Sequence, residues 1–373
     1  MDKLKVMTIL GTRPEIIRLS EVIRACDRCF NHLLVHTGQN WDYTLNEIFF
    51  KDLNLRQPNY FLNVVGADLG ETMGNIISST YKLMFRERPD ALLILGDTNS
   101  ALCAISAKRL KIPIFHMEAG NRCFDQNVPE EINRKIVDHI SDINLPYTEH
   151  SRRYLLSEGF RKEHIYVTGS PMAEVILRQR PKINASSVLT ELGVCKGEYF
   201  IVSAHREENI DIDQKFNELV AAINAIAEEY KKPIIFSTHP RTMKRIQAKG
   251  VKFNTLIRNM KPFSFSDYCR LQLDSYCVLS DSGTLSEESN ILHFPAVLLR
   301  NSTERPEVLD VGTIVIGGFR KETLLQSVLL AVDTFNKEAV KAGDYRDENV
   351  SEKVVKIIQS YTTIIDKIVW DKI

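Results

Sequence analysis

The sequence predicts an α/β protein built from two Rossmann-like, doubly wound domains. Three observations support this fold class: the chain has 373 residues, short apolar runs alternate with amphipathic stretches, and the alternation restarts midway along the chain. A chain of this length exceeds what one ordinary hydrophobic core holds. Alternating strand and helix patterns are typical of parallel sheets covered by helices. We therefore expect two domains of similar architecture.

The first half of the chain contains strand-like runs separated by amphipathic segments. These runs are 5–10, 33–38, 91–97, 112–120, 143–147 and 165–169. They are short, rich in apolar residues and bounded by Gly, Pro or polar residues, as buried parallel strands are. We predict that they form an N-terminal domain over residues 1–172.

The same pattern begins again after a Gly/Pro break and a polar helical segment. The second set of strand-like runs is 199–206, 233–240, 253–259, 276–283, 295–300 and 312–318. We predict a C-terminal domain over residues 173–354. The amphipathic segment at about 355–373 is expected to be a helix, and its pattern alone allows it to pack on either domain.

Composition excludes several classes of protein. Lys+Arg and Asp+Glu both number 48, and this zero net charge argues against a nucleic-acid partner. No apolar run reaches the length of a membrane span and the start of the chain lacks a signal-peptide pattern, so we expect a cytoplasmic protein without a membrane partner. The seven scattered cysteines fit reduced thiols, and Cys26 and Cys29 lie within a helical pattern that does not suggest a metal site.

Charged residues follow three predicted strands of the N-terminal domain. Arg13 precedes a helix start, where the dipole disfavours a cation unless an anion binds there, although a solvated surface residue explains Arg13 alone equally well. Asp97 could simply cap the next helix. Glu118 is harder to explain, because it ends an apolar run where a hydrophobic residue would be less costly.

Further charged residues lie on the predicted helices of this domain. Glu130 and Glu131 follow Pro129 in a first helical turn, where the helix dipole explains one acid easily. Arg134 lies one turn further on. Arg18 lies one turn after Arg13 and, taken alone, is better explained as a surface charge.

In the C-terminal domain, His205 and His239 end two predicted strands and Ser282 and Gly283 follow a third. A single histidine at a strand end is usually structural, but two of them beside arginines favour a functional site. The Ser282-Gly283 turn opens a helix and suits an anion. The chain contains neither a P-loop nor a G-x-G-x-x-G sequence. In the segment 303–310, Glu304 and Arg305 are expected to be surface or loop residues.

Ligands of open α/β sheets bind beyond the carboxyl ends of the strands, and a cleft between two such domains is the first place to expect a site. The residues above predict carboxylates on one wall and His, Arg and helix N-termini on the other. Such a site can hold a diphosphate and carry out acid–base chemistry.

Seven short motifs occur in order along about residues 4–365. They are GTRPE, GDTNS, HMEAG, PEEINR, AHREEN, DSGTLSEE and TERPE. Each is weak alone, but the ordered set closely resembles the non-hydrolysing UDP-N-acetylglucosamine 2-epimerases. The resemblance implies the glycosyltransferase-B architecture of two Rossmann-like domains, a C-terminal helix that crosses back to the first domain, and a homodimer.

Several positions depart from the common family pattern. Residues 204–208 read AHREE, residues 284–286 read TLS, Arg18 replaces a lysine, and the segment NRCFDQNVPEE replaces a longer loop. These departures resemble the branch that makes UDP-N-acetyl-L-fucosamine from UDP-2-acetamido-2,6-dideoxy-L-talose for capsule or O-antigen (lipopolysaccharide). The alternatives are a UDP-N-acetylglucosamine 2-epimerase giving UDP-N-acetylmannosamine and, from another class, a glycosyltransferase on the same fold.

The resemblance implies that UDP leaves C1, that a 2-acetamidoglycal forms, and that re-addition inverts C2. This route requires no NAD and no metal. The implied catalytic residues are Asp97, Glu118, Glu130 and His205, without a distinction between base and acid. The implied UDP-sugar-binding residues are Arg13, Arg18, Arg134, His239, Phe265, Ser282, Gly283 and Glu288.

Overall fold

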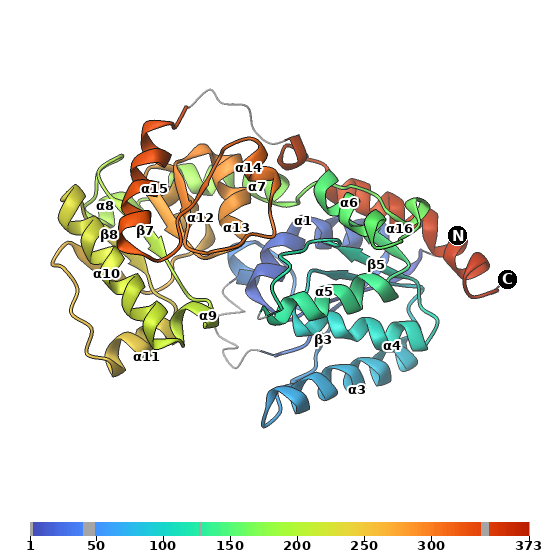
Figure 1. Cartoon of the computed structure of the whole chain (residues 1–373). Helices are drawn as coiled ribbons and strands as arrows, with labels where there is room; N and C mark the ends of the chain where they lie inside the picture. Colours follow the sequence, from blue (N-terminus) through green and yellow to red (C-terminus); the bar gives the residue numbers. More distant parts are fainter. Residues whose placement is uncertain (1–2, 40–48, 127, 337–342, 373) are drawn as a thin grey trace. The chain divides into compact units, whose positions relative to one another are not determined.

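The computed structural model describes residues 3–39, 49–126, 128–336 and 343–372. The chain divides into two compact units (Figure 1). Unit 1 comprises Met1–Leu177 and Arg346–Ile373, and unit 2 comprises Arg178–Tyr345. Within the described residues, no helix is both long and apolar enough to cross a membrane.

Unit 1 is built on a parallel sheet that has six strands among the residues described. The strands are β1 (Lys5–Leu10), β2 (Asn31–His36), β3 (Tyr60–Phe61), β4 (Ala91–Leu95), β5 (Ile114–Met117) and β6 (Ile143–Leu145). Their order in the sheet is β3-β2-β1-β4-β5-β6. This is the strand order of the Rossmann fold, in which the direction of winding reverses between the first and fourth strands.

One predicted strand of this unit is wrong. Residues 165–169 form only a single bridge, between Ile165 and Asn144. The N–H groups of Tyr166 and Thr168 donate to the carbonyls of Asn144 and Pro146, so this segment runs beside β6 without forming a continuous ladder. The sixth strand is instead β3, at the opposite edge, which is too short to give a clear sequence pattern.

Helices pack on both faces of this sheet. They are α1 (Arg13–Cys29), α3 (Leu69–Glu87), α4 (Cys103–Arg109), α5 (Pro129–Ile140), α6 (Glu149–Ser157), the first part of α7 (Met172–Ala185), α16 (Val350–Ile368) and the 3-10 turns Asn99–Leu102 and Lys162–His164. Helix α16 packs against α1, so the end of the chain completes the unit that the start of the chain forms (Figure 1).

Unit 2 repeats this architecture. Its described strands are β7 (Phe200–Ser203), β8 (Ile234–Ser237), β9 (Ile257–Met260), β10 (Cys277–Ser280), β11 (Ala296–Leu298) and β12 (Val315–Ile316). All are parallel, in the order β12-β11-β10-β7-β8-β9. This is again the Rossmann order, with the reversal between β7 and β10, and it confirms the predicted fold class.

The helices of unit 2 surround a core that includes Phe200, Val202, Ile234 and Leu279, all with at most 1% exposure. The helices are the second part of α7, then α8 (Val188–Leu192), α9 (Glu207–Ile210), α10 (Asp213–Tyr230), α11 (Pro240–Ala248), α12 (Phe265–Leu273), α13 (Thr284–Glu288), a π-helical turn (Ser289–His293), α14 (Glu307–Asp310), α15 (Lys321–Asp333) and a 3-10 turn (Gly343–Tyr345).

Candidate active site

Four of the predicted residues lie where winding reverses in each sheet. In unit 1, Arg13 follows β1 and Asp97 follows β4, and these two strands are neighbours on either side of the reversal. In unit 2, His205 follows β7 and Ser282 follows β10, which have the equivalent relationship. This position at the carboxyl ends of the strands is where open α/β sheets bind ligands.

Glu118 lies directly after β5 in an unusual backbone conformation. Its φ is +64°, in the left-handed region that residues with a Cβ seldom adopt. The side chain is 8% exposed, and its carboxylate forms an ion pair with Arg18 of α1 and lies 3.3 Å from the amide nitrogen of Asn121. The sequence predicted a carboxylate at this strand end, but the expectation that Arg18 is a surface charge is wrong, because Arg18 is 8% exposed and pairs with Glu118.

The turn that carries Asp97 touches Glu118. A Cβ on Gly96 would lie 3.3 Å from the Oε2 atom of Glu118, so the glycine allows the two turns to approach closely. The Nε atom of Arg134 lies 2.6 Å from the Oδ2 atom of Asp97. Asn133 donates its side-chain amide to the Asp97 carbonyl at 2.9 Å. The structure therefore brings Asp97, Glu118 and Arg134 into one cluster.

The two adjacent acids at the start of α5 have different surroundings. Glu131 is 1% exposed, pairs with Arg134 at 2.7 Å and accepts the backbone N–H groups of Cys123 and Phe124. Burial opposes its ionisation, but these donors outweigh burial and hold the pKa of Glu131 below its ordinary value. Glu131 thus anchors the loop after Glu118, whereas Glu130 is half-buried in the same helical turn.

Arg13 begins α1 and is half-buried, with its guanidinium 4.8 Å from the ring centre of Phe49. Below it, the Oε2 atom of Glu15 accepts the Gly11 N–H at 3.1 Å and the Thr12 hydroxyl at 2.7 Å. Burial raises the pKa of Glu15 to about 7, and the hydrogen bonds lower it only in part. The turn that carries Arg13 is therefore held by a buried carboxyl group.

In unit 2, Asp281 organises the turn that carries His205. Its carboxylate accepts the N–H groups of His205 and Arg206 at 3.0 and 2.9 Å, and it lies 3.2 Å from the Nδ1 atom of His205. Burial opposes ionisation of Asp281, but His205 and these donors lower its pKa to about 2. The histidine side chain is 42% exposed, so a fixed anion below supports an imidazole that solvent and ligands can reach.

Ser282 and Gly283 follow Asp281 and lead into α13. The Ser282 hydroxyl lies 2.9 Å from that of Thr284. A Cβ on Gly283 would lie only 2.7 Å from a carboxylate oxygen of Glu304, so Glu304 approaches this turn closely. Glu304 and Arg305 were expected to be surface or loop residues: they lie in the loop between β11 and α14 but not at the surface, being 5% and 1% exposed. Ion pairs with Arg300 and Glu287 compensate their burial.

The other predicted residues of unit 2 occupy separate places. His239 is the exposed N-cap of α11, accepts the Arg241 N–H at 3.3 Å, and its ring centre lies 6.0 Å from that of His205. Glu288, at the end of α13, accepts a 2.6 Å hydrogen bond from Gln272. Phe265 begins α12 and is 5% exposed, so little of its ring can face a ligand.

Several supporting residues were not among the predicted site residues. Asn121, Glu131, Gln272 and Asp281 contact the predicted side chains directly. Three of them lie within one to three residues of a predicted site residue, and this proximity was the available signal. Gln272 carried no such signal, because it lies on α12 and reaches Glu288 across the unit.

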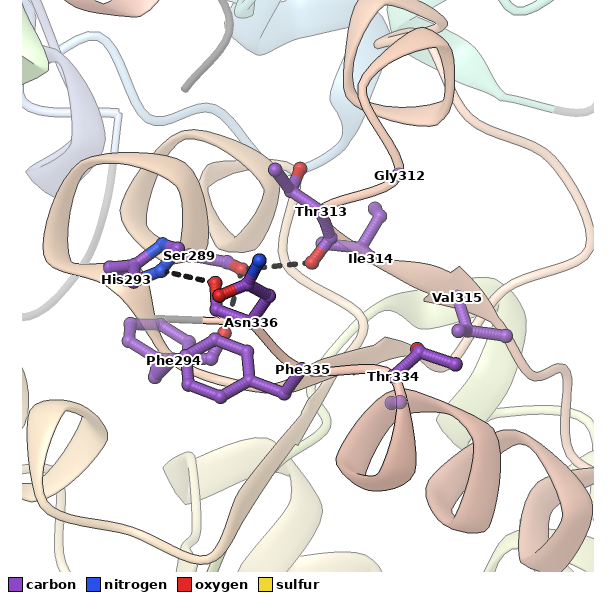
Figure 2. Close-up of a pocket in the computed structure, with 11 residues that line it drawn as sticks. Ser289, His293, Phe294, Gly312, Thr313, Ile314, Val315, Thr334, Phe335 and Asn336 are labelled. Carbon is purple, nitrogen blue, oxygen red and sulfur yellow. Dashed lines mark hydrogen bonds between the residues drawn. The ribbon is translucent and has the colours of Figure 1, made fainter. Parts of the chain in front are cut away.

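A pocket elsewhere in unit 2 is not this site. It measures about 450 Å³ including space open to solvent and is lined by residues of the π-helical turn, the segment before β12 and the end of α15. In Figure 2, His293 binds the Asn336 carbonyl and Ser289 binds the carbonyls of Phe294 and Thr313. Among the described residues that line it, none is a predicted site residue.

Comparison with known proteins places these residues in context. A family model described as UDP-N-acetylglucosamine 2-epimerase matches residues 24–359. The structure of UDP-N-acetylglucosamine 2-epimerase from Rickettsia bellii is 45% identical, with 99% of this chain and 100% of that chain covered and a TM-score of 0.91. The Methanocaldococcus jannaschii enzyme, solved with UDP-GlcNAc and UDP, is 35% identical, with 96% and 100% covered and a TM-score of 0.90.

A third relative is named for a different sugar. It is the UDP-2,3-diacetamido-2,3-dideoxy-D-glucuronate 2-epimerase of Pseudomonas aeruginosa, 32% identical over 87% of this chain and 91% of its own length. Both the family model and these relatives cover most of the described chain.

Proposed function

This chain belongs to the UDP-N-acetylglucosamine 2-epimerase family, and from that premise we propose that it inverts C2 of UDP-2-acetamido-2,6-dideoxy-L-talose to give UDP-N-acetyl-L-fucosamine. Members of the family are isomerases that act on UDP-sugars. The proposed product would serve capsule or O-antigen synthesis, and the working form of the protein would be a cytoplasmic homodimer.

The observation that supports this proposal most directly is the carboxylate cluster of unit 1. The C2 hydrogen of a 2-acetamido sugar is not acidic until UDP leaves C1, because positive charge at C1 then acidifies the neighbouring C–H bond. Removing that proton and returning one to the other face requires at least two groups that exchange protons. Glu118 and Asp97 meet this requirement at adjacent strand ends, each beside a guanidinium. Glu130 supplies a third candidate.

Unit 2 would hold the departing UDP. We assign His205 to the leaving phosphate, because the carboxylate of Asp281 lies beside its imidazole and fixes the ring. Arg13 of unit 1, with His239, Ser282 and Gly283, would bind the diphosphate. Glu288 would bind the ribose hydroxyls, and the segment that includes Phe265 would bind uracil. Arg18 and Arg134 would orient the carboxylates that they pair with in the structure.

The choice of sugar rests on the sequence departures at residues 204–208 and 284–286 and in the loop after Glu118. A second candidate is UDP-N-acetylglucosamine, because the Rickettsia bellii and Methanocaldococcus jannaschii proteins are named for that substrate. Both reactions would use the same carboxylates. The substrate must therefore be tested directly.

The test is incubation with each UDP-sugar in D2O, followed by proton NMR. Deuterium at an inverted C2 from the talose compound alone supports the proposal, and the same result from the glucosamine compound alone selects the second candidate. If neither UDP-sugar takes up deuterium at C2, in a protein that still binds UDP, the proposed epimerase function is rejected and a transferase is favoured. Glu118→Gln is expected to abolish exchange while UDP still binds.

A further inference from the structure

A buried histidine–aspartate pair in unit 1 has no part in the chemistry proposed above. His116 lies on β5, two residues before Glu118, and is 1% exposed. Asp138 lies on α5 and is fully buried. The Nδ1 atom of His116 is 2.9 Å from the Oδ1 atom of Asp138. Ionisable groups are rarely buried this completely unless they are paired.

The second ring nitrogen of His116 contacts the turn that carries Asp97. Its Nε2 atom lies 2.8 Å from the carbonyl oxygen of Gly96. Both neighbours of the ring, a carboxylate and a carbonyl, are acceptors. His116 therefore connects the end of β4 to α5.

Asp138 connects the same ring to the turn that carries Glu118. Its carboxylate accepts the Gly120 N–H at 3.1 Å and the Arg122 guanidinium at 2.7 Å. Arg122 in turn forms a two-pronged contact of 2.7 and 2.6 Å with Glu158. Burial opposes ionisation of Asp138, but His116 and Arg122 outweigh it and keep the pKa of Asp138 below its ordinary value.

The turn that carries Glu118 adopts a backbone conformation that needs such support. Gly96, Glu118 and Gly120 have φ values of +71°, +64° and +79°. A left-handed residue with a Cβ persists only where surrounding contacts determine its conformation. The His116 and Asp138 contacts with the backbone lie within two residues of Asp97 and Glu118 and supply this constraint from beneath the sheet edge.

We propose that His116 and Asp138 are positioning residues that hold the turns of Asp97 and Glu118 at a fixed separation for proton transfer at C2. This inference rests on the proposed epimerase function. It assigns neither residue a contact with substrate. It adds a requirement to the site, namely that the two carboxylates are correctly placed only while the buried pair of His116 and Asp138 contacts both turns.

Two substitutions separate the contacts of His116. Glutamine has its amide nitrogen at a reach similar to that of Nε2, so His116→Gln can keep the bond to Gly96 and lose Asp138. Asparagine resembles the Nδ1 side, so His116→Asn can keep Asp138 and lose Gly96. His116→Leu removes both. The matched control is His32→Asn, because His32 is also buried in this sheet beside an aspartate, Asp27, but lies toward the opposite end of the strands.

Activity and UDP binding are measured on each folded variant. We expect His116→Leu to lower kcat on the order of 10²-fold, since a displacement of about 1 Å can cost that much. The kcat values of His116→Gln and His116→Asn should lie between those of His116→Leu and the wild type. KM and the calorimetric Kd for UDP should stay unchanged, and His32→Asn should retain the wild-type kcat even if its Tm falls.

Hydrogen exchange followed by mass spectrometry gives a readout that needs no substrate. Loss of the His116 contacts should speed exchange in segments 94–99 and 117–123, whereas His32→Asn should affect 5–10 and 31–36. Unchanged kcat in all His116 variants, or equal losses of kcat in His32→Asn, would overturn the inference. If the wild type epimerises neither UDP-sugar, the proposed function is rejected. Unchanged amide hydrogen exchange at both turns in the His116 variants would separately refute the positioning role.

Discussion

Glu15 is the buried carboxyl group beneath the turn that carries Arg13, and its substitution gives a quantitative prediction. The side chain is 2% exposed and accepts hydrogen bonds from Gly11 and Thr12. Burial raises the pKa of Glu15 from 4.5 to about 7. Glu15→Gln keeps the shape and one acceptor oxygen but cannot ionise. The two proteins should therefore differ in how their stability depends on pH.

The sign of the effect follows from proton linkage. Between pH 4.5 and about 7 the folded protein holds a proton on Glu15 that the unfolded chain has already lost, so the free energy of unfolding falls as the pH rises. The difference between 4.5 and about 7, at 1.36 kcal/mol for each pH unit, gives about 3 kcal/mol. Glu15→Gln should match the wild type near pH 4.5 and exceed it by that amount above pH 7.

The assay is urea unfolding of both proteins at intervals from pH 4.5 to pH 8, followed by circular dichroism. The control is Glu352→Gln, an exposed position on α16 in the same unit. A stability difference between Glu15→Gln and wild type that stays constant across this range would refute the reasoning, because a group without a raised pKa gives no such slope.

Three further substitutions test other parts of the site. Arg134→Met removes the guanidinium between Asp97 and Glu131 and should cost roughly 3 kcal/mol in urea unfolding. Asp281→Asn should cost roughly 2 kcal/mol at pH 7, because its pKa of about 2 lies below 3.8, and the loss should disappear as the pH falls through 2 in acid-unfolding midpoints. Gly283→Ala adds a Cβ 2.7 Å from a carboxylate and should weaken calorimetric UDP binding roughly tenfold.

The sequence predicted the parts of the site that follow from strand ends. Buried parallel strands are apolar and short, so a charged residue directly after one, such as Asp97 or Glu118, stands out. The sheet order then places these two residues together, since β4 and β5 are neighbours, and the reversal between β1 and β4 adds Arg13 beside Asp97. The same reasoning predicted His205 and Ser282 in unit 2.

Other features depend on contacts between residues far apart in the chain. Glu304 and Arg305 carry charges that predict exposure, but ion pairs with Arg300 and Glu287 allow their burial. The left-handed backbone of Glu118 has no local signal, because glutamate rarely adopts it. A histidine within an apolar run, such as His116, gives no indication of its partner until α5 brings Asp138 beside it.

The closing of unit 1 by α16 has a consequence for synthesis on the ribosome. Unit 2 is one continuous segment, Arg178–Tyr345, whereas unit 1 needs Arg346–Ile373 in addition to the start of the chain. Unit 1, whose N-terminal segment leaves the ribosome first, is therefore the last unit to be completed. Until α16 has been synthesised, the face of α1 that packs against α16 stays uncovered. In a nascent chain, unit 2 can therefore be complete before unit 1. Premature termination before α16 should destabilise unit 1, although most of its residues are synthesised first.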